Sequence, residues 1–595
     1  MGGDGRTTYP FPEMPLAVSL PTNPAPLDLA ELGIVGDRRS AALLTRAGRV
    51  VWYCPGRFHR PSLLAALLDE ARGGDWRLEW PGAAPAGRAY LGDSAVLDTR
   101  LDGPGGALTL TDFMPLGEGA PRGLCRRLTA APSDLALVLN AAPNYALQPA
   151  DPRPEGRGVR VGGRWLYGSH PLEVRGQSVR MRVPADEPAW AFLADAPRAD
   201  LTADDPARWQ AATLAHWAGL AQDDDRQEPY GEAVRDSLRA LRACSDEETG
   251  GTVAAPTTSL PEVPGGQANW DYRYVWLRDA GMVVSALTRA GNLRAGRRFL
   301  DFVCRYGRPQ GELPLAPFLT TEGELPPPET PLPLAGYADS RPVRLGNDAR
   351  DQLQLDAYGN LLLAAKLIYE RSGERPHWAV VERLADFLSE RWADDDSGVW
   401  EERTPRPYVA GKVLSACALT YLAPYADPTR AGRWRAAADA ARAWVERYGR
   451  TSTGAYAYIA GGEAVDVTAA LYPVWGYCPP DSPAMLATVA ALEERARGHL
   501  YRRHLEGEEG RGEGFFMTGT FWMAQYWVMR DPARARTILD AALAHANDLG
   551  LLAEEVSADG ALLGNLPQTF VHGALIGAVV DLREAEQKAR AERAG

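Results

Sequence analysis

The stretch Asn269–Ala280 reads N-W-D-Y-R-Y-V-W-L-R-D-A and places two Trp, two Tyr, two Asp and two Arg within twelve residues. An apolar run follows it, so Arg278 and Asp279 stand where a helix is expected to begin. Aromatic rings stack on the CH faces of a sugar, and carboxylates and guanidinium groups bind its hydroxyls through charge-assisted hydrogen bonds. A Trp-rich helix start with a structural ion pair would show the same residues. Taken alone, the stretch leaves both interpretations open.

The chain on either side of this stretch, from about Tyr230 onward, has apolar residues spaced as in amphipathic helices. Helices in alternating hairpins build either a superhelix of repeats or a closed toroid of six hairpins. No segment repeats itself at a fixed period, which favours the closed toroid. Twelve helical segments are expected, starting near residues 230, 279, 293, 350, 375, 408, 427, 466, 483, 515, 531 and 567.

The long loops between these segments hold the candidate functional residues. Each such loop precedes an even-numbered helix of the series. If the helices alternate in direction, all of these loops lie at one end of the toroid and form a funnel lined by aromatic rings and carboxylates. The loops are 270–279, 346–352, 398–403, 554–556 and 563–568.

The first third of the chain is expected to be a β-sandwich. Residues 33 to about 195 read as short strands broken by turn residues, with Gly162-Gly163 as a two-residue hairpin signal. Many short strands with Gly and Pro turns indicate two packed antiparallel sheets, here a structural or partner-binding unit. One helix is predicted within it, near Ser62 to Glu70. The predicted domains are a sandwich with a loose N-terminal segment (1–200), a helical linker ending at Asp223–Asp225 (201–229), a helical toroid (230–585) and a charged tail (586–595).

Composition narrows the classes of function. A chain of 595 residues is long enough for two or more domains. The formal net charge of -13, without a Lys/Arg-rich block, argues against nucleic acid or an anionic membrane as a partner. No signal-peptide pattern and no run of 18 apolar residues is present, so a cytoplasmic location is expected. The six Cys show no C-x-x-C spacing, and neither a metal nor a redox cofactor is predicted. The oligomeric state cannot be read from the sequence.

Two pairs of acids suit the hydrolysis of a glycosidic bond. That reaction needs a protonated carboxylic acid for the leaving oxygen and a second carboxylate, about 6.5–9.5 Å away in an inverting enzyme. Glu401 and Glu402 follow Trp400, and Glu554 and Glu555 lie about 150 residues further on, so the two pairs can face each other across a funnel. Either pair alone would more simply be solvated acids at a helix entrance.

Four motifs in this order and spacing resemble the bacterial glucoamylase-type enzymes of glycoside hydrolase family 15, which include glucodextranases and trehalase-like proteins. The resemblance extends to the sandwich, through G-I-V-G-D-R-R-S-A-A-L-L (33–44) and L-T-D-F-M-P (110–115), and covers nearly the whole chain. The motifs are A-A-P-T-T-S-L-P-E (254–262) before N-W-D-Y-R-Y-V-W-L-R-D-A (269–280), G-N-D-A-R-D-Q-L-Q-L-D-A-Y-G (346–359), S-G-V-W-E-E-R (397–403), and L-L-A-E-E-V (551–556) with L-G-N-L-P-Q-T-F-V-H (563–572).

This resemblance implies an N-terminal β-sandwich, a helical linker and an (α/α)6 barrel. It implies an inverting hydrolase without a cofactor, which releases β-glucose from the non-reducing end of maltodextrin-type or small α-gluco-oligosaccharides. It also implies a role for each matching residue. The general acid is Glu401, the general base is Glu554, the terminal glucose is held by Arg278 and Asp279 with Trp276 and Tyr272 beside them, and Trp400 and Glu402 contact the substrate.

The sequence departs from the family pattern at a few positions and leaves alternatives open. Ala553 stands where a Ser usually precedes the base, and G-T-F-W replaces C-S-F-W at 519–522. Because the carboxylates are retained, these changes are expected to affect rate and specificity. The substrate could instead be α,α-trehalose, which the family also accommodates. A glycoside phosphorylase is disfavoured because it would not need Glu554, and a non-catalytic sugar-binding protein is disfavoured by the paired acids. His572 is a candidate for support of the late loop, and Gly323–Pro333 either borders the funnel or crosses the surface. A bell-shaped pH profile on the acidic side of neutrality is expected.

Overall fold

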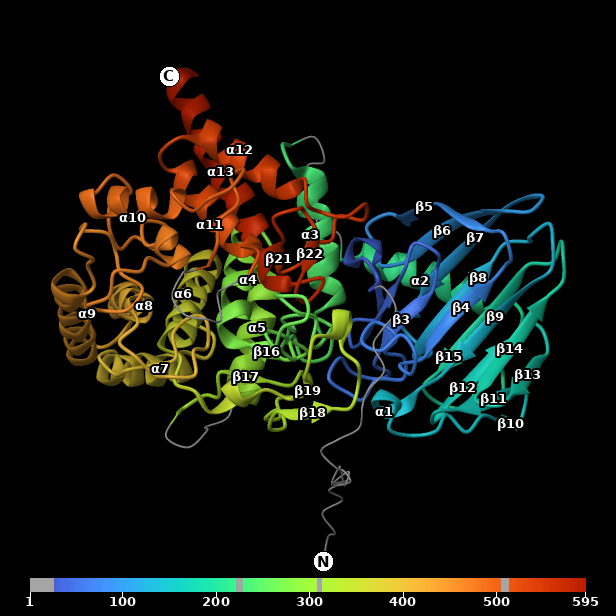
Figure 1. The fold of residues 1–595 in the computed structure, drawn as a ribbon. Coiled ribbons are helices and arrows are strands. Elements are labelled where there is room, and N and C mark those ends of the chain that lie inside the picture. The colour runs from blue at the N-terminus through green and yellow to red at the C-terminus, as the bar shows by residue number, and fades with distance from the viewer. Residues whose placement is uncertain (1–25, 221–227, 308–312, 504–512, 595) are drawn as a thin grey trace, which may run out of the picture.

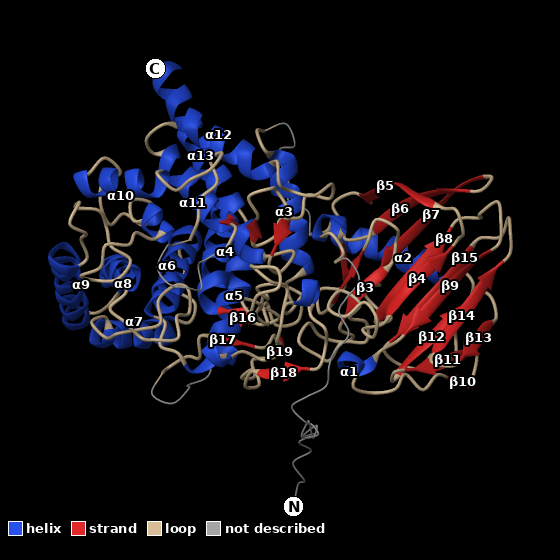
Figure 2. Ribbon diagram, in the orientation of Figure 1, coloured by secondary structure: helices blue, strands red, loops and turns tan. Residues whose placement is uncertain are grey.

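The computed structural model describes residues 26–220, 228–307, 313–503 and 513–594. Strands gather on one side of the molecule and helices on the other, as Figures 1 and 2 show. The sandwich is therefore the first of two units in chain order, and the helical unit is the second. The predicted loose start at residues 1–25 and the predicted linker end at Asp223–Asp225 lie outside the described residues. The predicted domain boundaries remain predictions.

Two sheets with antiparallel pairing form the sandwich, as predicted. The sheet orders are β1-β2-β3-β4-β9-β14-β13 and β10-β11-β12-β15-β8-β7-β6-β5. Inward positions alternate with outward ones, as in β6, where Leu97, Thr99 and Leu101 are buried. The strands are β1 Gly33–Gly36, β2 Ala41–Leu44, β3 Val50–Tyr53, β4 Asp75–Glu79, β5 Ala84–Tyr90, β6 Leu97–Gly103, β7 Gly106–Phe113, β8 Gly123–Leu128, β9 Leu135–Asn140, β10 Arg153–Glu155, β11 Gly158–Val161, β12 Arg164–Gly168, β13 Leu172–Arg175, β14 Ser178–Val183 and β15 Ala189–Ala194.

The local predictions in the sandwich have mixed outcomes. The β11–β12 hairpin is confirmed, and Gly162 and Gly163 both have the positive φ (55° and 74°) that a tight primed turn requires. The helix predicted over residues 62–70 is wrong, because this segment forms turns. Its backbone bonds to neighbouring segments instead: the Ala65 N–H donates to the carbonyl of Gly73 (2.6 Å), and the Leu67 N–H donates to Val51 (3.0 Å).

The helical unit is an (α/α)6 barrel. The inner elements α4, α6, α8, η5, α11 and α13 form the ring, with α13 packed against α4 to close it, and the outer helices α3, α5, α7, α9, α10 and α12 surround them. The predicted linker helix is α2. The bounds are η1 Leu29–Glu31, α1 Pro143–Ala146, α2 Asp205–Ala218, α3 Gly231–Ala243, α4 Leu277–Arg289, α5 Leu293–Tyr306, η2 Tyr337–Asp339, η3 Asp348–Asp351, α6 Leu355–Ser372, α7 Trp378–Arg391, α8 Val409–Leu422, η4 Ala423–Tyr425, α9 Pro428–Tyr448, η5 Val467–Leu471, α10 Pro483–Glu493, α11 Met517–Val528, α12 Pro532–Leu543 and α13 Thr569–Ala594.

One of the twelve predicted segments differs in kind. The element expected near residue 466 is only the short 3₁₀ helix η5, because Pro473 follows it closely and cannot donate the backbone hydrogen bond that a longer helix needs. Short strands connect the loops at the entrances of the inner helices. They are β16 Val275–Trp276 with β17 Phe318–Leu319, β18 Thr330–Leu332 with β19 Val343–Leu345, and β20 Phe515–Phe516 with β21 Glu555–Val556 and β22 Leu562–Leu563.

Arg273, within the Asn269–Ala280 stretch, joins the two units. Its guanidinium is fully buried, pairs with Asp271 (both contacts 2.8 Å) and donates a hydrogen bond to the hydroxyl of Tyr145 in the sandwich (2.7 Å). The neighbouring Tyr272 contacts the barrel instead (Tyr272 OH to Glu554 Oε1, 3.0 Å). Neighbouring side chains of the stretch therefore contact different units: Arg273 binds the sandwich, and Tyr272 binds the barrel.

Among the helices that the structure describes, none combines the length and apolar character needed to cross a bilayer. All six Cys are unpaired thiols, four of them buried. The compartment remains a prediction.

Candidate active site

A cavity of about 1200 Å³, called here the front cavity, opens where the chain enters the inner helices α4, α6 and α8. Three of the five predicted loops meet at this cavity, since residues within 270–272, 347–353 and 396–405 line it, whereas residues 554–556 and 563–568 do not. Glu329 lines it as well, so the loop 323–333 borders the mouth. Among the predicted site residues, Tyr272, Trp400, Glu401 and Glu402 line this cavity.

Glu401, the predicted general acid, stands on a strained turn. Its backbone has a φ of 61°, a left-handed conformation that is uncommon outside glycine and clusters at functional sites. The side chain is 17% exposed, and its Oε1 accepts a hydrogen bond from Arg278 Nη2 at 2.9 Å. Oε2 has no partner among the described residues, which leaves it available to a ligand oxygen.

Arg278 and Asp279 begin α4, next to Glu401. Arg278 also donates to the carboxylate of Asp279 (2.8 Å) and to the carbonyl of Val399, the residue two positions before Glu401. Burial raises the pKa of Asp279 to about 6, and the Arg278 guanidinium opposes this rise. The predicted sugar-binding pair is thus directly bonded to the predicted acid, and both of its members are buried behind the cavity wall.

The aromatic residues fall into a contact layer and a supporting layer. Trp400 lines the cavity and packs on Trp522 (ring centroids 5.9 Å apart), and its indole N–H donates to Asp466. Trp276 does not line the cavity, because it is buried and stacked on Phe318 (4.3 Å). Trp276 therefore supports Tyr272, whose ring meets it edge-on at 5.5 Å.

Glu554, the predicted general base, lies behind Tyr272. It is 2% exposed, and its Oε1 accepts a hydrogen bond from the Tyr272 hydroxyl at 3.0 Å. Its Oε2 is buried and accepts no hydrogen bond from the described residues. Burial raises the pKa of Glu554 well above its usual range, the charge of Glu262 raises it further, and Arg503 and the Tyr272 hydrogen bond act in the opposite direction.

Glycine and histidine fix the loop that carries Glu554. Gly564 has a φ of 75°, and a Cβ placed there would lie only 2.5 Å from Glu554 Oε2, so this position requires glycine. His572 is fully buried, accepts a hydrogen bond from the Leu552 N–H (3.3 Å) and contacts the hydroxyl of Ser237 (2.9 Å). Burial lowers the pKa of His572 to about 3, so the ring is neutral. His572 therefore supports the loop from outside the cavity.

The predicted substrate contact Glu402 is held from the opposite side. Its carboxylate accepts a hydrogen bond from the hydroxyl of Tyr458 (2.9 Å), while the residue itself lines the front cavity. The backbone carbonyls of Glu401 and Glu402 both lie within hydrogen-bond reach of Gln352 Nε2 (3.1 and 3.4 Å). Gln352 ties the acid-bearing loop to the entrance of α6.

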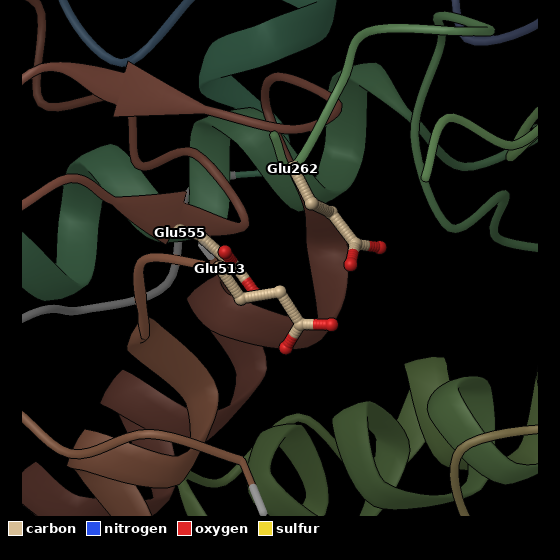
Figure 3. A group of neighbouring side chains, drawn as sticks. All are labelled: Glu262, Glu513 and Glu555. Atoms are coloured by element: carbon tan, nitrogen blue, oxygen red, sulfur yellow. The ribbon is translucent and has the colours of Figure 1, made fainter. Parts of the chain in front are cut away.

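Sequence reasoning assigned no role to a charged cluster beside Glu554. Arg503 is buried among Glu262, Glu513 (2.8 Å) and Glu555 (3.8 Å), with Glu262 in direct contact. Figure 3 shows Glu262 reaching into this space from one side and Glu513 and Glu555 from the other. Glu262 stands in a motif that was noted for its resemblance, whereas Arg503 carried no sequence signal.

This cluster is also the group of described acids whose spacing would suit a cation, since oxygens of Glu262, Glu513 and Glu555 lie within 4.8 Å of one another. The guanidinium of Arg503 already supplies a positive charge to all three. Burial raises the pKa of Glu262 to about 7, and Arg503 counters that rise. The arrangement thus places several buried acids that compete for protons next to Glu554.

Comparison with known proteins matches this geometry. The sequence model of Glycosyl hydrolases family 15 matches residues 228–530 and 528–580, and that of the trehalase-like N-terminal domain matches residues 22–195. A trehalase of Mycolicibacterium smegmatis is 30% identical over 98% of this chain and 96% of the relative, and trehalase 1 of Sulfolobus acidocaldarius is 28% identical over 94% and 99%. A bacterial glucoamylase structure in complex with acarbose superposes with a TM-score of 0.69 over 96% of this chain and 98% of that one, at 14% identity, which shows a shared fold.

A β-sandwich joined to an (α/α)6 barrel, with acids around a cavity at the entrances of the inner helices, defines a glycoside hydrolase. The chain belongs to glycoside hydrolase family 15.

Proposed function

We propose that this glycoside hydrolase cleaves α,α-trehalose with inversion, using Glu401 as general acid and Glu554 as general base. The observation that carries the choice of substrate is the similarity to trehalases along nearly the whole chain, sandwich included. The expectation of a maltodextrin substrate therefore takes second place. Its support is the front cavity, whose volume of about 1200 Å³ would also admit a longer oligosaccharide.

In the proposed reaction, Arg278 exchanges its bond to Glu401 for bonds to the hydroxyls of the bound glucose, with Asp279 as the second partner. This exchange releases the Glu401 carboxyl to hold a proton, which it donates to the bridging oxygen as the bond breaks. Arg278 lies 2.9 Å from Glu401, so the sugar and the acid compete for one guanidinium. Binding of the sugar thereby prepares the acid.

On the opposite side, Glu554 Oε2 takes the proton of the attacking water. This buried oxygen has no hydrogen-bond partner among the described residues, while Oε1 is fixed by Tyr272, so Oε2 can accept a proton without losing an existing hydrogen bond. The carboxylate must be ionised at that moment. Arg503 and the Tyr272 hydroxyl favour the charged form against burial and Glu262.

The products of trehalose distinguish this mechanism directly. Inversion releases one glucose in the β form, while the leaving glucose retains its α configuration. Proton NMR in the first seconds of turnover should therefore show equal amounts of the two anomers before mutarotation mixes them. Release of α-glucose alone would overturn the inverting mechanism.

Substrate choice is tested by glucose release from trehalose, maltose, maltotriose, isomaltose and kojibiose at equal concentration. We expect kcat/KM for trehalose to exceed the others by at least ~10-fold, a discrimination of about 1.4 kcal/mol in transition-state binding. A preference for maltotriose would return the assignment to a glucoamylase. Formation of glucose 1-phosphate that depends on phosphate would instead identify a phosphorylase.

The two acids are tested separately. Glu401→Gln and Glu554→Gln should each lower kcat by at least ~10²-fold, the scale of lost acid–base catalysis, while the far-UV circular dichroism stays unchanged. Glu232→Gln, on the exposed first turn of α3, is the matched control and should keep full activity. Near-full activity in either active-site variant would remove the role assigned to that residue.

A further inference from the structure

A second cavity, called here the rear cavity, lies inside the ring of inner helices. It measures about 240 Å³, and none of its lining residues lines the front cavity. Its walls come from α4, α6, α8, α11 and α13 and from the segment after η5. Arg289 and Tyr421, which line it, follow the first residues of α4 and α8 by twelve positions, about 18 Å along each helix axis. Other lining residues lie nearer the helix starts, such as Phe570, the second residue of α13, so the rear cavity extends from there toward the end of the barrel opposite the front cavity.

Two buried amide side chains leave hydrogen-bond acceptors at this cavity. Asn360 and Gln525 are 5% and 7% exposed, and both line it. Their NH₂ groups are used, since Asn360 Nδ2 donates to the carbonyl of Asp356 (3.0 Å) and Gln525 Nε2 donates to Asp581 (2.6 Å). No group among the described residues donates to either amide oxygen. Neither oxygen is among the buried side-chain atoms without a partner, so each has some surface open to the cavity, where the hydroxyl of a water or a ligand can donate to it.

The charges at the rear cavity are already compensated. Lys366 pairs with Glu370 at 2.9 Å, and Arg289 pairs with Asp581 and with Glu584 (3.1 Å). A charged ligand would have to compete with these ion pairs. A neutral ligand with donor groups would meet the free amide oxygens without disturbing them.

Aromatic rings and small residues set the shape of the space. Trp475 lines the cavity, and its ring is also stacked on Tyr472 (centroids 6.0 Å apart). Tyr421 is a second aromatic lining residue, and Ala574 on α13 is a small one. A flat ring with CH faces and hydroxyls at its edge meets aromatic faces and amide oxygens together.

We propose that the rear cavity binds one neutral pyranose. The cavity volume accommodates a single sugar ring and excludes an oligosaccharide. Glucose is named as the ligand because the proposed hydrolysis releases it, so that identity rests on the proposed function; the site itself rests on the cavity and its amide oxygens. Glucose donates to Asn360 and Gln525 through its hydroxyls and stacks on Trp475.

The test measures ligand binding in each cavity from the NMR signal of one tryptophan that lines it. The full-length protein is labelled with 5-fluorotryptophan, and fluorine NMR signals of Trp475 and Trp400 are assigned from Trp475→Phe and Trp400→Phe. Glucose is titrated alone, without turnover. We expect a saturable shift of the Trp475 signal with its own dissociation constant, separate from that of Trp400 in the front cavity. Because no hydrolysis is involved, the outcome is independent of whether trehalose is the substrate.

Two variants test the rear cavity: one fills its volume, and the other removes a hydrogen-bond acceptor. Ala574→Leu should abolish the Trp475 response, whereas Ala591→Leu, the same change on an exposed position of the same helix, should leave it intact. Asn360→Leu removes one acceptor and should weaken the response at least ~10-fold, which keeps the test decisive if Ala574→Leu does not fold. In every folded variant the Trp400 response should persist.

Three results would overturn the inference. The first is the absence of a saturable Trp475 shift in the unsubstituted protein. The second is an unchanged shift in folded Ala574→Leu, which would place the sugar elsewhere. The third is a shift with cyclohexanol but not with glucose, which would make the rear cavity an apolar pocket without a polyol site.

Discussion

At the scale of single residues, the candidate site places its acids next to two arginines, which stay charged. Arg278 is bonded to Glu401, and Arg503 lies beside Glu554 among three further acids. Each guanidinium favours the charged form of the acid that it faces. The proposed mechanism needs one acid protonated and the other ionised, so we expect the partners of the two arginines to influence the pH range of activity.

Glu262 gives a prediction about the base. Its charge raises the pKa of Glu554, so Glu262→Gln should lower that pKa. Activity is lost on the acidic side when the base becomes protonated, hence the acidic limb of the kcat/KM profile should move to lower pH. Arg503→Gln removes a group that lowers the same pKa and should move the limb to higher pH. The measurement is kcat/KM against pH for both variants.

The control for these two variants is Glu232→Gln, which changes an exposed acid and should leave the limb in place. Movement of the limb in the same direction for Glu262→Gln and Arg503→Gln would contradict the assignment of Glu554 as the titrating base.

The predicted acids are recognisable from sequence because each sits in a contiguous motif, while the cluster around Glu554 is not. Arg503 and Glu262 are 241 positions apart, and only the closure of the barrel brings them together. The burial of Glu554 behind Tyr272 is likewise a packing result. Sequence reasoning thus names the acids proposed to react and misses the charged neighbours that shift the pKa of Glu554.

At the scale of elements, side-chain caps mark some helix starts and not others: the outer helices α3 and α7 begin without one, and the inner element η5 is capped by Asp466. The outer helices α5, α9, α10 and α12 start with side-chain caps from Asn292, Asp427, Ser482 and Asp531, and their predicted starts are correct to within one residue. The inner helices α4, α6, α8 and α11 have no side-chain cap. Their first turns follow the loops that build the front cavity, which explains why the start of α6 was predicted five residues too early.

The turn α1 is the element that ties the sandwich to the barrel. Its residues Asn144, Tyr145 and Ala146 have φ values of 51°, 57° and 60°, which cost roughly 1–2 kcal/mol each for residues other than glycine. This turn presents the Tyr145 hydroxyl to the buried guanidinium of Arg273, next to Tyr272. No local sequence pattern predicts it, because the contact that stabilises it comes from a segment 128 positions away.

Tyr145→Phe tests this junction. The variant keeps the ring but removes an acceptor from a fully buried charged group, so the free energy of unfolding should fall by about 1–3 kcal/mol. The measurement is urea-induced unfolding followed by tryptophan fluorescence. Tyr448→Phe, at a ring that is 45% exposed, is the matched control and should change little. Equal stability of the two variants would show that the Tyr145 hydroxyl adds nothing to the other contacts of Arg273 with the sandwich, at the Arg60 carbonyl and at Cys54.

At the scale of the whole molecule, the two architectures were predictable from the spacing of apolar residues and turns, because each follows from local periodicity. The junction between them, the rear cavity and the balance of buried charge were not. The buried charges lie in both the sandwich and the barrel. Burial raises the pKa to about 6 in four Asp residues, to about 7 in one Glu and to about 8 in one Asp; these are Asp37, Asp279, Asp396 and Asp466, then Glu262, then Asp356.

These groups predict how stability depends on pH. In the unfolded chain Asp and Glu titrate near ~4, so between about pH 4 and pH 8 the folded protein binds more protons than the unfolded one. These six acids therefore stabilise the folded protein most at low pH, and this contribution to the free energy of unfolding is lost as pH rises through their folded-state pKa values. His572, with its pKa lowered to about 3, and His59, whose pKa burial also lowers, act in the opposite sense as pH falls below the ordinary value of a histidine, but they are two groups against six. Glu322, lowered to about 2, loses its contribution only below about pH 4.

The thermal midpoint at constant ionic strength should therefore be higher at pH 5.5 than at pH 8. Asp356→Asn removes the group with the highest folded pKa of the six and should flatten the upper part of this dependence, since the amide neither binds nor releases a proton. Glu232→Gln, on the surface, should leave the slope unchanged. Scanning calorimetry of the three proteins from pH 5 to pH 8 measures the slopes directly. A midpoint that rises steadily over this range in the unsubstituted protein would mean that its buried acids are ionised in the folded state, and that the arginines beside them outweigh burial.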